Sequence, residues 1–227
     1  MSDEGVPAIR IVCEGDTDEP IITELLMRLV DADFVADWIQ PERPLDRPGR
    51  YGELGSGWEG VRRWCQRQCE RFGSLSAALK EPPLRGCLAA IIHVDADVAG
   101  EEGVCCRRPC PPPSGTVDAL RAVVLEWAGE VALPGRVVLC IPSQAIEAWV
   151  FSALYSTPRL TGEQLECRAK PQTLLKQRPE KLVSGRDNRR IVEAYRAVAQ
   201  RVAAAWPKVC ATCTQAERFD RELRAVL

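Results

Sequence analysis

The chain has 227 residues, of which 46% are hydrophobic and eleven are cysteine, and its formal net charge is −2. This length fits one domain with an appendage or two small domains, and the hydrophobic share is enough for a sizeable core. No apolar run approaches the roughly 20 residues that span a bilayer, and the acidic N-terminus does not resemble a signal peptide. We therefore expect a cytoplasmic protein that does not act in a membrane and keeps its cysteines reduced.

Strands and helices are expected to alternate through the first two thirds of the chain. The run from Leu88 to Val94 is almost entirely apolar, which is typical of a strand buried on both faces of a parallel sheet. This alternation predicts an α/β domain over residues 1–158, with a parallel sheet flanked by helices. The expected strands cover about 8–13, 34–39, 87–94 and 137–141, the expected helices about 18–31, 58–80 and 116–131, with another beginning near Pro142, and the long loops about 41–57 and 98–115.

Residues 159–227 form a C-terminal extension that we expect to be helical and basic. Apolar residues recur at helical spacing between Ile191 and Trp206, which predicts one helix. Thr214 and Glu217 have the spacing of a capping box and predict the start of a last helix. No stretch of this extension has the pattern of a strand, so the sheet is expected to end before it.

A basic segment lies within this extension. From Arg168 to Arg190 there are eight basic residues and two acidic ones. Such a segment suits a polyanionic partner such as DNA or RNA, although a solvated basic helix and loop has the same composition. The candidate nucleic-acid-binding residues are Arg168, Lys170, Lys176, Arg178, Lys181, Arg186, Arg189 and Arg190.

Acidic residues follow two of the expected strands at the points where those strands end. Glu14 and Asp18 follow the first strand, and Asp95 and Asp97 follow the strand at 87–94. The carboxyl ends of parallel strands lie at one edge of a sheet, where ligands bind in such folds. Clustered carboxylates repel each other unless a cation lies among them, and their hard oxygens favour Mg²⁺ or Mn²⁺. The sequence therefore predicts metal-assisted chemistry on a phosphate.

The order of these motifs resembles that of the TOPRIM domain, which occurs in topoisomerases, bacterial primases, recombination-mediator proteins and overcoming-lysogenisation-defect nucleases. They are most similar to those nucleases and to small stand-alone TOPRIM proteins, some of which are linked to anti-phage defence. Many topoisomerases have a third acidic residue at the position that is Ala99 here. The resemblance covers about residues 8–155 and implies a TOPRIM-like sheet. The segments that carry it are Glu14-Gly15-x-Thr17-Asp18, Asp95-x-Asp97 and the later Glu147-Ala148-Trp149.

The positions of the acidic residues and the resemblance together imply a role for each. Asp95 and Asp97 can approach one cation, and the resemblance assigns Glu14 either to that metal or to proton abstraction from a bound water. Asp18 is near enough to bind metal through water, and Glu147 is the candidate ligand of a second cation. Two cations roughly 4 Å apart can hold the attacking and leaving oxygens of an in-line displacement.

These features predict a metal-dependent endonuclease, a phosphodiesterase that requires Mg²⁺ or Mn²⁺ and acts on DNA or RNA. Lys170, with Arg168, is the candidate for stabilising charge in the transition state. The resemblance also suggests an anti-phage effector activated by an ATPase encoded nearby, since the chain has no phosphate-binding loop of its own. The alternative is a TOPRIM scaffold that binds nucleic acid or a partner protein without cutting. Topoisomerase and primase activities are not expected, because the chain lacks the separate domains that those reactions need.

The single histidine and the cysteines leave further alternatives open. His93 precedes Asp95 within the buried strand and is expected to be a packed residue rather than a ligand, although it can tune Asp95. One Cys-x-x-Cys pair and an irregular trio of cysteines resemble a zinc site only weakly, because zinc usually takes two close pairs. These residues are Cys210 and Cys213 in the pair, and Cys105, Cys106 and Cys110 in the trio.

Overall fold

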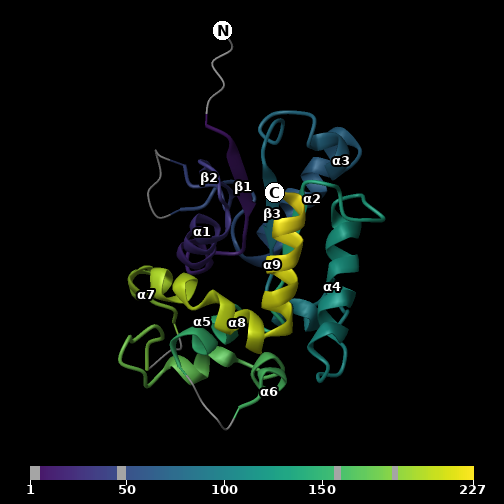
Figure 1. The fold of residues 1–227 in the computed structure, drawn as a ribbon. Coiled ribbons are helices and arrows are strands. Elements are labelled where there is room, and N and C mark those ends of the chain that lie inside the picture. The colour runs from purple at the N-terminus through teal and green to yellow at the C-terminus, as the bar shows by residue number, and fades with distance from the viewer. Residues whose placement is uncertain (1–5, 45–49, 156–159, 186–188) are drawn as a thin grey trace.

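In the computed structural model, the chain forms an α/β fold around one four-stranded sheet (Figure 1). The structure describes residues 6–44, 50–155, 160–185 and 189–227. All the strands are parallel and lie in the order β2-β1-β3-β4. The predicted fold class is confirmed, and the architecture is consistent with a TOPRIM-like fold. The strands are β1 (Ala8–Val12), β2 (Val35–Gln40), β3 (Ala89–His93) and β4 (Val137–Cys140).

Helices connect consecutive strands and allow them to run parallel. The connections contain α1 (Asp18–Leu29) after β1, α2 (Gly57–Phe72) and α3 (Leu75–Ala78) after β2, and the 3₁₀ helix η1 (Ala96–Gly100) and α4 (Pro113–Trp127) after β3. The part after β4 contains α5 (Glu147–Leu154), α6 (Gly162–Glu166), the 3₁₀ helix η2 (Pro171–Leu175), α7 (Val192–Ala204), α8 (Trp206–Thr212) and α9 (Thr214–Val226).

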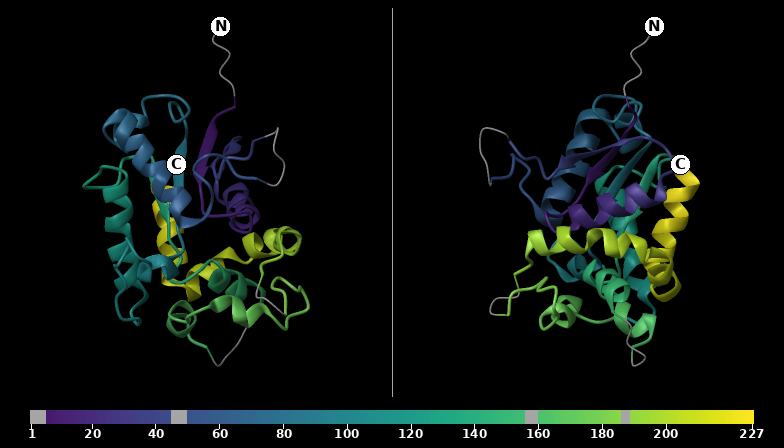
Figure 2. Two further views of the ribbon diagram at one scale, coloured as in Figure 1. Left: turned by 180° about the vertical axis from the view of Figure 1, so that it is seen from behind. Right: turned by 60° about the vertical axis from the view of Figure 1, so that its left-hand side comes forward.

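The two faces of the sheet pack against different sets of helices. Side chains alternate along a strand, so Ile9 and Ile11 of β1 lie on one face and Val12 on the other. The face of Ile9 and Ile11 is covered by α1, α5, α7, α8 and α9, whereas α2, α3 and α4 cover the opposite face. Figure 2 shows α1 and α7 on one side of the sheet and α2 and α4 on the other. All five residues of β3 are buried, as the apolar run predicted.

The helices after β4 share a core with the N-terminal part of the chain. Trp149 of α5 is fully buried, and its ring centroid lies 5.5 Å from that of Trp206 and 6.1 Å from that of Phe219. In addition, α7 packs along α1 and α9 packs against β4. The predicted boundary between residues 158 and 159 lies outside the described residues, but the C-terminal part is helical as expected.

Several local predictions differ from the structure. The helix expected over 58–80 is divided, because Gly73 has a left-handed φ of 88° that ends α2 before α3 begins. The capping box expected from Thr214 and Glu217 is wrong. Instead, the buried carboxylate of Glu166 accepts hydrogen bonds from the backbone N–H of Thr214 at 2.7 Å and of Gln215 at 2.9 Å, and so caps α9 from a distant helix.

The cysteines differ in part from the expectation that all of them are reduced. Cys110 and Cys167, which are 57 residues apart, form a disulfide bond, so the expectation of reduced cysteines is wrong for this pair. The other nine cysteines are free thiols. Cys210 and Cys213 belong to no group that can hold a metal ion in the described part of the chain.

Among the described residues, no helix combines the length and the apolar character needed to cross a membrane.

Candidate active site at the carboxyl edge of the sheet

Five carboxyl groups from separate segments come together where the strands end, and we call them the acidic edge. Glu14 follows β1, Asp18 begins α1, Asp95 and Asp97 follow β3, and Glu147 begins α5 after β4. The side chain of Glu14 accepts a hydrogen bond from the backbone N–H of Asp95 at 2.7 Å, which ties the end of β1 to the end of β3. The structure thus brings together the five carboxyl groups that the sequence named as candidate metal ligands.

The segment after β4 is held against the segment after β3 by backbone hydrogen bonds. The N–H of Ala96 donates to the carbonyl of Pro142 at 3.1 Å, and the N–H of Asp97 donates to that of Gln144 at 2.9 Å. The N–H of Ile146 donates to the Asp95 carboxylate at 3.1 Å. These contacts place Glu147, the next residue, beside the aspartates.

A buried histidine lies between two of the aspartates. The Nε2 atom of His93 is 3.4 Å from Asp95 Oδ1, and its Nδ1 atom is 4.0 Å from Asp18 Oδ2. Burial lowers the pKa of His93, but the neighbouring carboxylates of Asp95 and Asp18 outweigh this effect and raise it to about 9. His93 is packed inside the strand as expected, and at neutral pH it contributes a positive charge to the acidic edge.

Arg190 supplies the other positive charge within the cluster. Its Nη2 atom donates to Glu147 Oε2 at 2.9 Å and lies 3.4 Å from Asp95 Oδ2, and its Nε atom pairs with Glu147 Oε1. The hydroxyl of Tyr195 also donates to Glu147 Oε1 at 2.7 Å. Burial raises the pKa of Glu147, and Arg190 opposes this effect. Burial also acts to raise the pKa of Asp95, but His93 and Arg190 bring it below its ordinary value.

The remaining three carboxyl groups have less positive charge near them. Desolvation and the charge of Asp95 raise the pKa of Glu14 well above its ordinary value. Desolvation raises the pKa of Asp18 to about 7 despite the nearby His93, and desolvation with the charge of Asp95 raises that of Asp97 to about 7. The raised pKa values show that the nearby positive charges do not offset the burial and mutual repulsion of these three groups, and a bound cation would relieve that repulsion.

The carboxylate oxygens of the acidic edge are the ligand type that a hard divalent cation prefers, but their present positions do not form a metal site. In the described part of the chain, no three His, Cys, Asp or Glu side chains are grouped so that they can hold a metal ion. The buried Oδ1 atom of Asp18 has no hydrogen-bond partner, and the exposed side chain of Asp97 makes no hydrogen bond with any described residue. Carboxylate oxygens of this kind suit Mg²⁺ or Mn²⁺. Glu147 differs, because both of its oxygens already bind Arg190 or Tyr195.

The structure brings only part of the predicted basic segment to this edge. Arg190 contacts the carboxylates directly, whereas Lys170 is exposed and has no hydrogen bond or ion pair with them among the described residues. Arg178 stacks on Tyr155, with its Cζ atom 4.6 Å from the ring centroid. Arg186 lies outside the described residues. Of the others, Arg168, Lys181 and Arg189 are exposed and Lys176 is half-buried.

Sequence reasoning missed two residues of the site. Tyr195 was recognised only as an apolar position of a helix, although its hydroxyl binds Glu147. Arg107, which lies in the loop expected over 98–115, donates to the backbone carbonyl of Asp97 at 2.6 Å. A Cβ atom at Gly100 would lie 3.2 Å from Arg107 Nε, so the glycine makes room for this side chain. No periodic pattern surrounds Arg107, so its role could not be predicted from the sequence.

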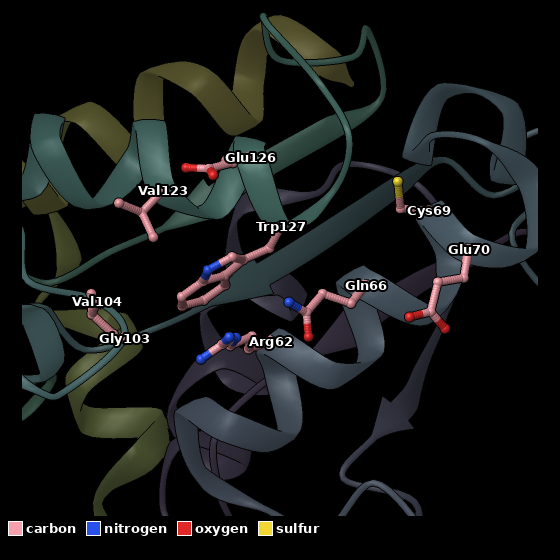
Figure 3. A pocket seen from close by; sticks show the side chains of 9 residues that line it. All are labelled: Arg62, Gln66, Cys69, Glu70, Gly103, Val104, Val123, Glu126 and Trp127. Atoms are coloured by element: carbon pink, nitrogen blue, oxygen red, sulfur yellow. The ribbon is translucent and has the colours of Figure 1, made fainter.

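A separate, open pocket of about 460 Å³ lies between α2 and α4 and is bordered by Gly103 and Val104 (Figure 3). Its other lining residues include Arg62 of α2, and Glu126 and Trp127 of α4. None of the five carboxyl groups of the acidic edge lines this pocket. The predicted site is therefore the edge of the sheet and not this pocket.

Comparison of the chain with models of known protein families, with curated proteins and with solved structures gave no match. Membership of the TOPRIM family therefore stays a prediction based on the order of the acidic motifs. The parallel sheet is consistent with that prediction.

Proposed function

We propose that this protein is a divalent-metal-dependent nuclease that hydrolyses phosphodiester bonds at the acidic edge. The observation that carries the proposal is the meeting of Glu14, Asp95 and Asp97 at the ends of two adjacent parallel strands, where burial and the charge of Asp95 raise the pKa of Glu14 and Asp97. A protein gains no stability from burying carboxyl groups against one another, so such clusters are typical of functional sites.

Glu14, Asp95 and Asp97 would hold Mg²⁺ or Mn²⁺, with Asp18 next to them. When bound, such an ion lowers the pKa of a coordinated water and stabilises charge on a phosphate. Glu14 is also suited to accept a proton, because burial and the charge of Asp95 raise its pKa and make it a stronger base than an ordinary glutamate. Arg107 is exposed beside Asp97 and places a positive charge at the same edge, where it can attract a phosphate group.

The proposed substrate is DNA or RNA. Exposed cations of the segment 168–190, among them Lys170 and Lys181, would contact the phosphate backbone and position the substrate without reading its sequence. Anti-phage defence and activation by an ATPase belong to this proposal as one biological setting. They predict that cleavage by the isolated chain is slow and that addition of the ATPase increases it.

The test is a cleavage assay on supercoiled plasmid, single-stranded DNA and a pool of RNAs, with Mg²⁺, Mn²⁺ or EDTA. Asp97→Asn is the informative variant, because this exposed side chain makes no hydrogen bond within the described structure. Glu102→Gln is the matched control, since Glu102 is an exposed carboxylate five residues further along the same loop. We expect metal-dependent cleavage that falls roughly 100-fold or more in Asp97→Asn and is unchanged in Glu102→Gln.

A non-cleaving scaffold that binds nucleic acid or a partner protein is the second candidate. It is favoured by the ion pair of Arg190 with Glu147, which partly neutralises the acidic edge without a metal. On that hypothesis, wild-type protein retains nucleic acid on a filter or in a gel shift, but neither binds Mn²⁺ nor cuts any of the three substrates. This combination would exclude the nuclease.

A further inference from the structure

One guanidinium group bridges the two carboxylates nearest to β4. Arg190 Nη2 is 2.9 Å from Glu147 Oε2 and 3.4 Å from Asp95 Oδ2. The sequence placed Glu147 as the ligand of a second metal ion, beside the ion expected at Asp95. In the structure, the position between these two carboxylates is taken by Arg190.

Both carboxylate oxygens of Glu147 are already bound by other side chains, so a metal ion would have to compete for them. Its side chain is fully buried, Oε2 accepts from Arg190, and Oε1 accepts from Tyr195 and pairs with Arg190. A metal at Glu147 would have to remove Arg190 from these contacts. The guanidinium is charged at every accessible pH, so its removal would leave a permanent positive charge to be accommodated elsewhere.

The backbone holds Arg190 in this place. Arg190 forms an antiparallel bridge with Val183, and the N–H of Ile191 donates to the carbonyl of Leu182 at 2.9 Å. Leu182 and Val183 are buried in the same core as Trp149. The arginine therefore comes from a packed segment of the C-terminal part and not from a free surface side chain.

Arg190 also keeps part of its side chain accessible. About 30% of the side chain is exposed, and Nη1 makes no hydrogen bond with the described residues. Arginine can bind a phosphate through two parallel N–H groups. A phosphate oxygen near Asp95 can therefore reach the guanidinium while Glu147 still holds it.

We propose that Arg190 replaces the second metal ion of the site, so that the enzyme works with one divalent cation and one built-in guanidinium. Glu147 and Tyr195 then serve as positioning residues that hold Arg190. The residues that would hold the cation are Glu14, Asp95 and Asp97. This inference rests on the proposed nuclease function and deepens it.

The experiment counts bound Mn²⁺ by electron paramagnetic resonance and calorimetry in wild-type protein, Glu147→Gln and Asp97→Asn. We expect one Mn²⁺ per chain in the wild type and in Glu147→Gln, and a strongly weakened site in Asp97→Asn. Two Mn²⁺ ions in the wild type and one in Glu147→Gln would overturn the inference and leave the nuclease standing. No Mn²⁺ in the wild type would instead overturn the proposed function, and with it this inference.

Arg190 variants separate a catalytic contribution from a structural one. Arg190→Met is expected to acquire a second Mn²⁺ at Asp95 and Glu147 and to lose roughly 100-fold in cleavage rate. Arg190→Lys keeps the charge and is expected to bind one Mn²⁺ and recover part of that rate. Arg196→Met, at an exposed arginine of α7, is the control. Folding of each variant is checked by circular dichroism, and wild-type cleavage rates in both folded Arg190 variants would overturn the inference.

Discussion

The carboxylates of the acidic edge near β4 and those near β1 and β3 differ in whether the protein itself supplies a counter-charge. On the β4 side, Glu147 is fully buried and its charge is met by Arg190 and Tyr195. On the other side, Glu14 and Asp97 make no side-chain ion pair with any described residue, and burial and the charge of Asp95 raise the pKa of each. The pKa of Glu147 is also raised by burial, so the difference between the halves lies in the ion pair and not in the direction of the pKa. The carboxylate on the β4 side is therefore neutralised by an ion pair within the protein, whereas the carboxylates of Glu14 and Asp97 are not.

This difference indicates where an external cation would bind. Metal binding at a carboxylate that already has an ion pair breaks that ion pair. Metal binding at a protonated carboxyl group without an ion pair requires only the release of its proton. We therefore expect the two halves to respond oppositely to mutation, to pH and to metal. Asp95 belongs to both halves, since its carboxylate meets His93, Arg190 and the backbone of Ile146.

The largest expected contrast is in stability without metal. Glu147→Gln should lower the free energy of unfolding by roughly 3 kcal/mol, because it leaves Arg190 partly buried without its main counter-charge. Asp97→Asn should not lower it at neutral pH, because the exposed side chain makes no hydrogen bond in the described structure and the variant removes a charge that Asp95 repels. Urea denaturation in EDTA measures both, and equal effects would remove the distinction between the halves.

The second contrast is the pH dependence of stability in EDTA. The pKa of Asp18 rises from an ordinary 3.8 to about 7 in the folded protein, so folding favours its protonated form. Its contribution is greatest below about pH 4 and is lost as the pH rises towards 7, at about 1.4 kcal/mol per unit. The raised pKa of His93, about 9, acts in the same direction from about pH 6.5 to 9.

We therefore expect the free energy of unfolding to fall between pH 5 and pH 8 in the wild type. Asp18→Asn should flatten the part between pH 5 and pH 7, because this variant has no proton to lose there. Denaturation at a series of pH values measures the slope. A stability that rises over the same range in EDTA would contradict the raised pKa values.

Binding of Mn²⁺ should oppose the fall in the free energy of unfolding between pH 5 and pH 8. At a Mn²⁺ concentration about 30-fold above the dissociation constant, the wild type should gain about 2 kcal/mol of stability. The gain should increase with pH, since binding displaces protons from Asp18 and from the raised carboxyl groups. Asp97→Asn should show little gain and Glu147→Gln a full one. Thermal denaturation with and without Mn²⁺ gives the comparison.

On the paired side, a smaller loss of stability than that of Glu147→Gln is expected at Tyr195. Tyr195→Phe removes the hydrogen bond to Glu147 and should lower the free energy of unfolding by about 1.5 kcal/mol. Arg190 still pairs with Glu147 in this variant, so Mn²⁺ affinity should not change measurably. A large loss of Mn²⁺ affinity would mean that the two halves are coupled more tightly than the contacts indicate.

The acidic edge could be predicted because its information is local. Each carboxyl group follows an apolar run, and parallel strands bring their carboxyl ends to one edge whatever the rest of the fold does. The same logic identified the sheet and most of the long helices. Short elements such as α6 and η2, with five residues each, have too few turns to show a helical period.

The partners of the acidic residues could not be predicted in the same way. Arg190 is 43 residues from Glu147, and Glu166 is 48 residues from the Thr214 backbone that it caps. Both contacts depend on how the C-terminal segments pack against the sheet, and composition says nothing about that packing. The charge excess of the segment 168–190 suggested a surface for nucleic acid, although one of its arginines lies inside the site.

The most direct measurement is a Mn²⁺-soaked crystal examined by anomalous diffraction. We expect one anomalous peak close to the carboxylates of Glu14, Asp95 and Asp97, with Arg190 still bound to Glu147. A peak at Glu147 with Arg190 displaced would contradict the division of the acidic edge into a paired half and a metal-binding half. A crystal with no peak at a saturating Mn²⁺ concentration would contradict the metal site itself.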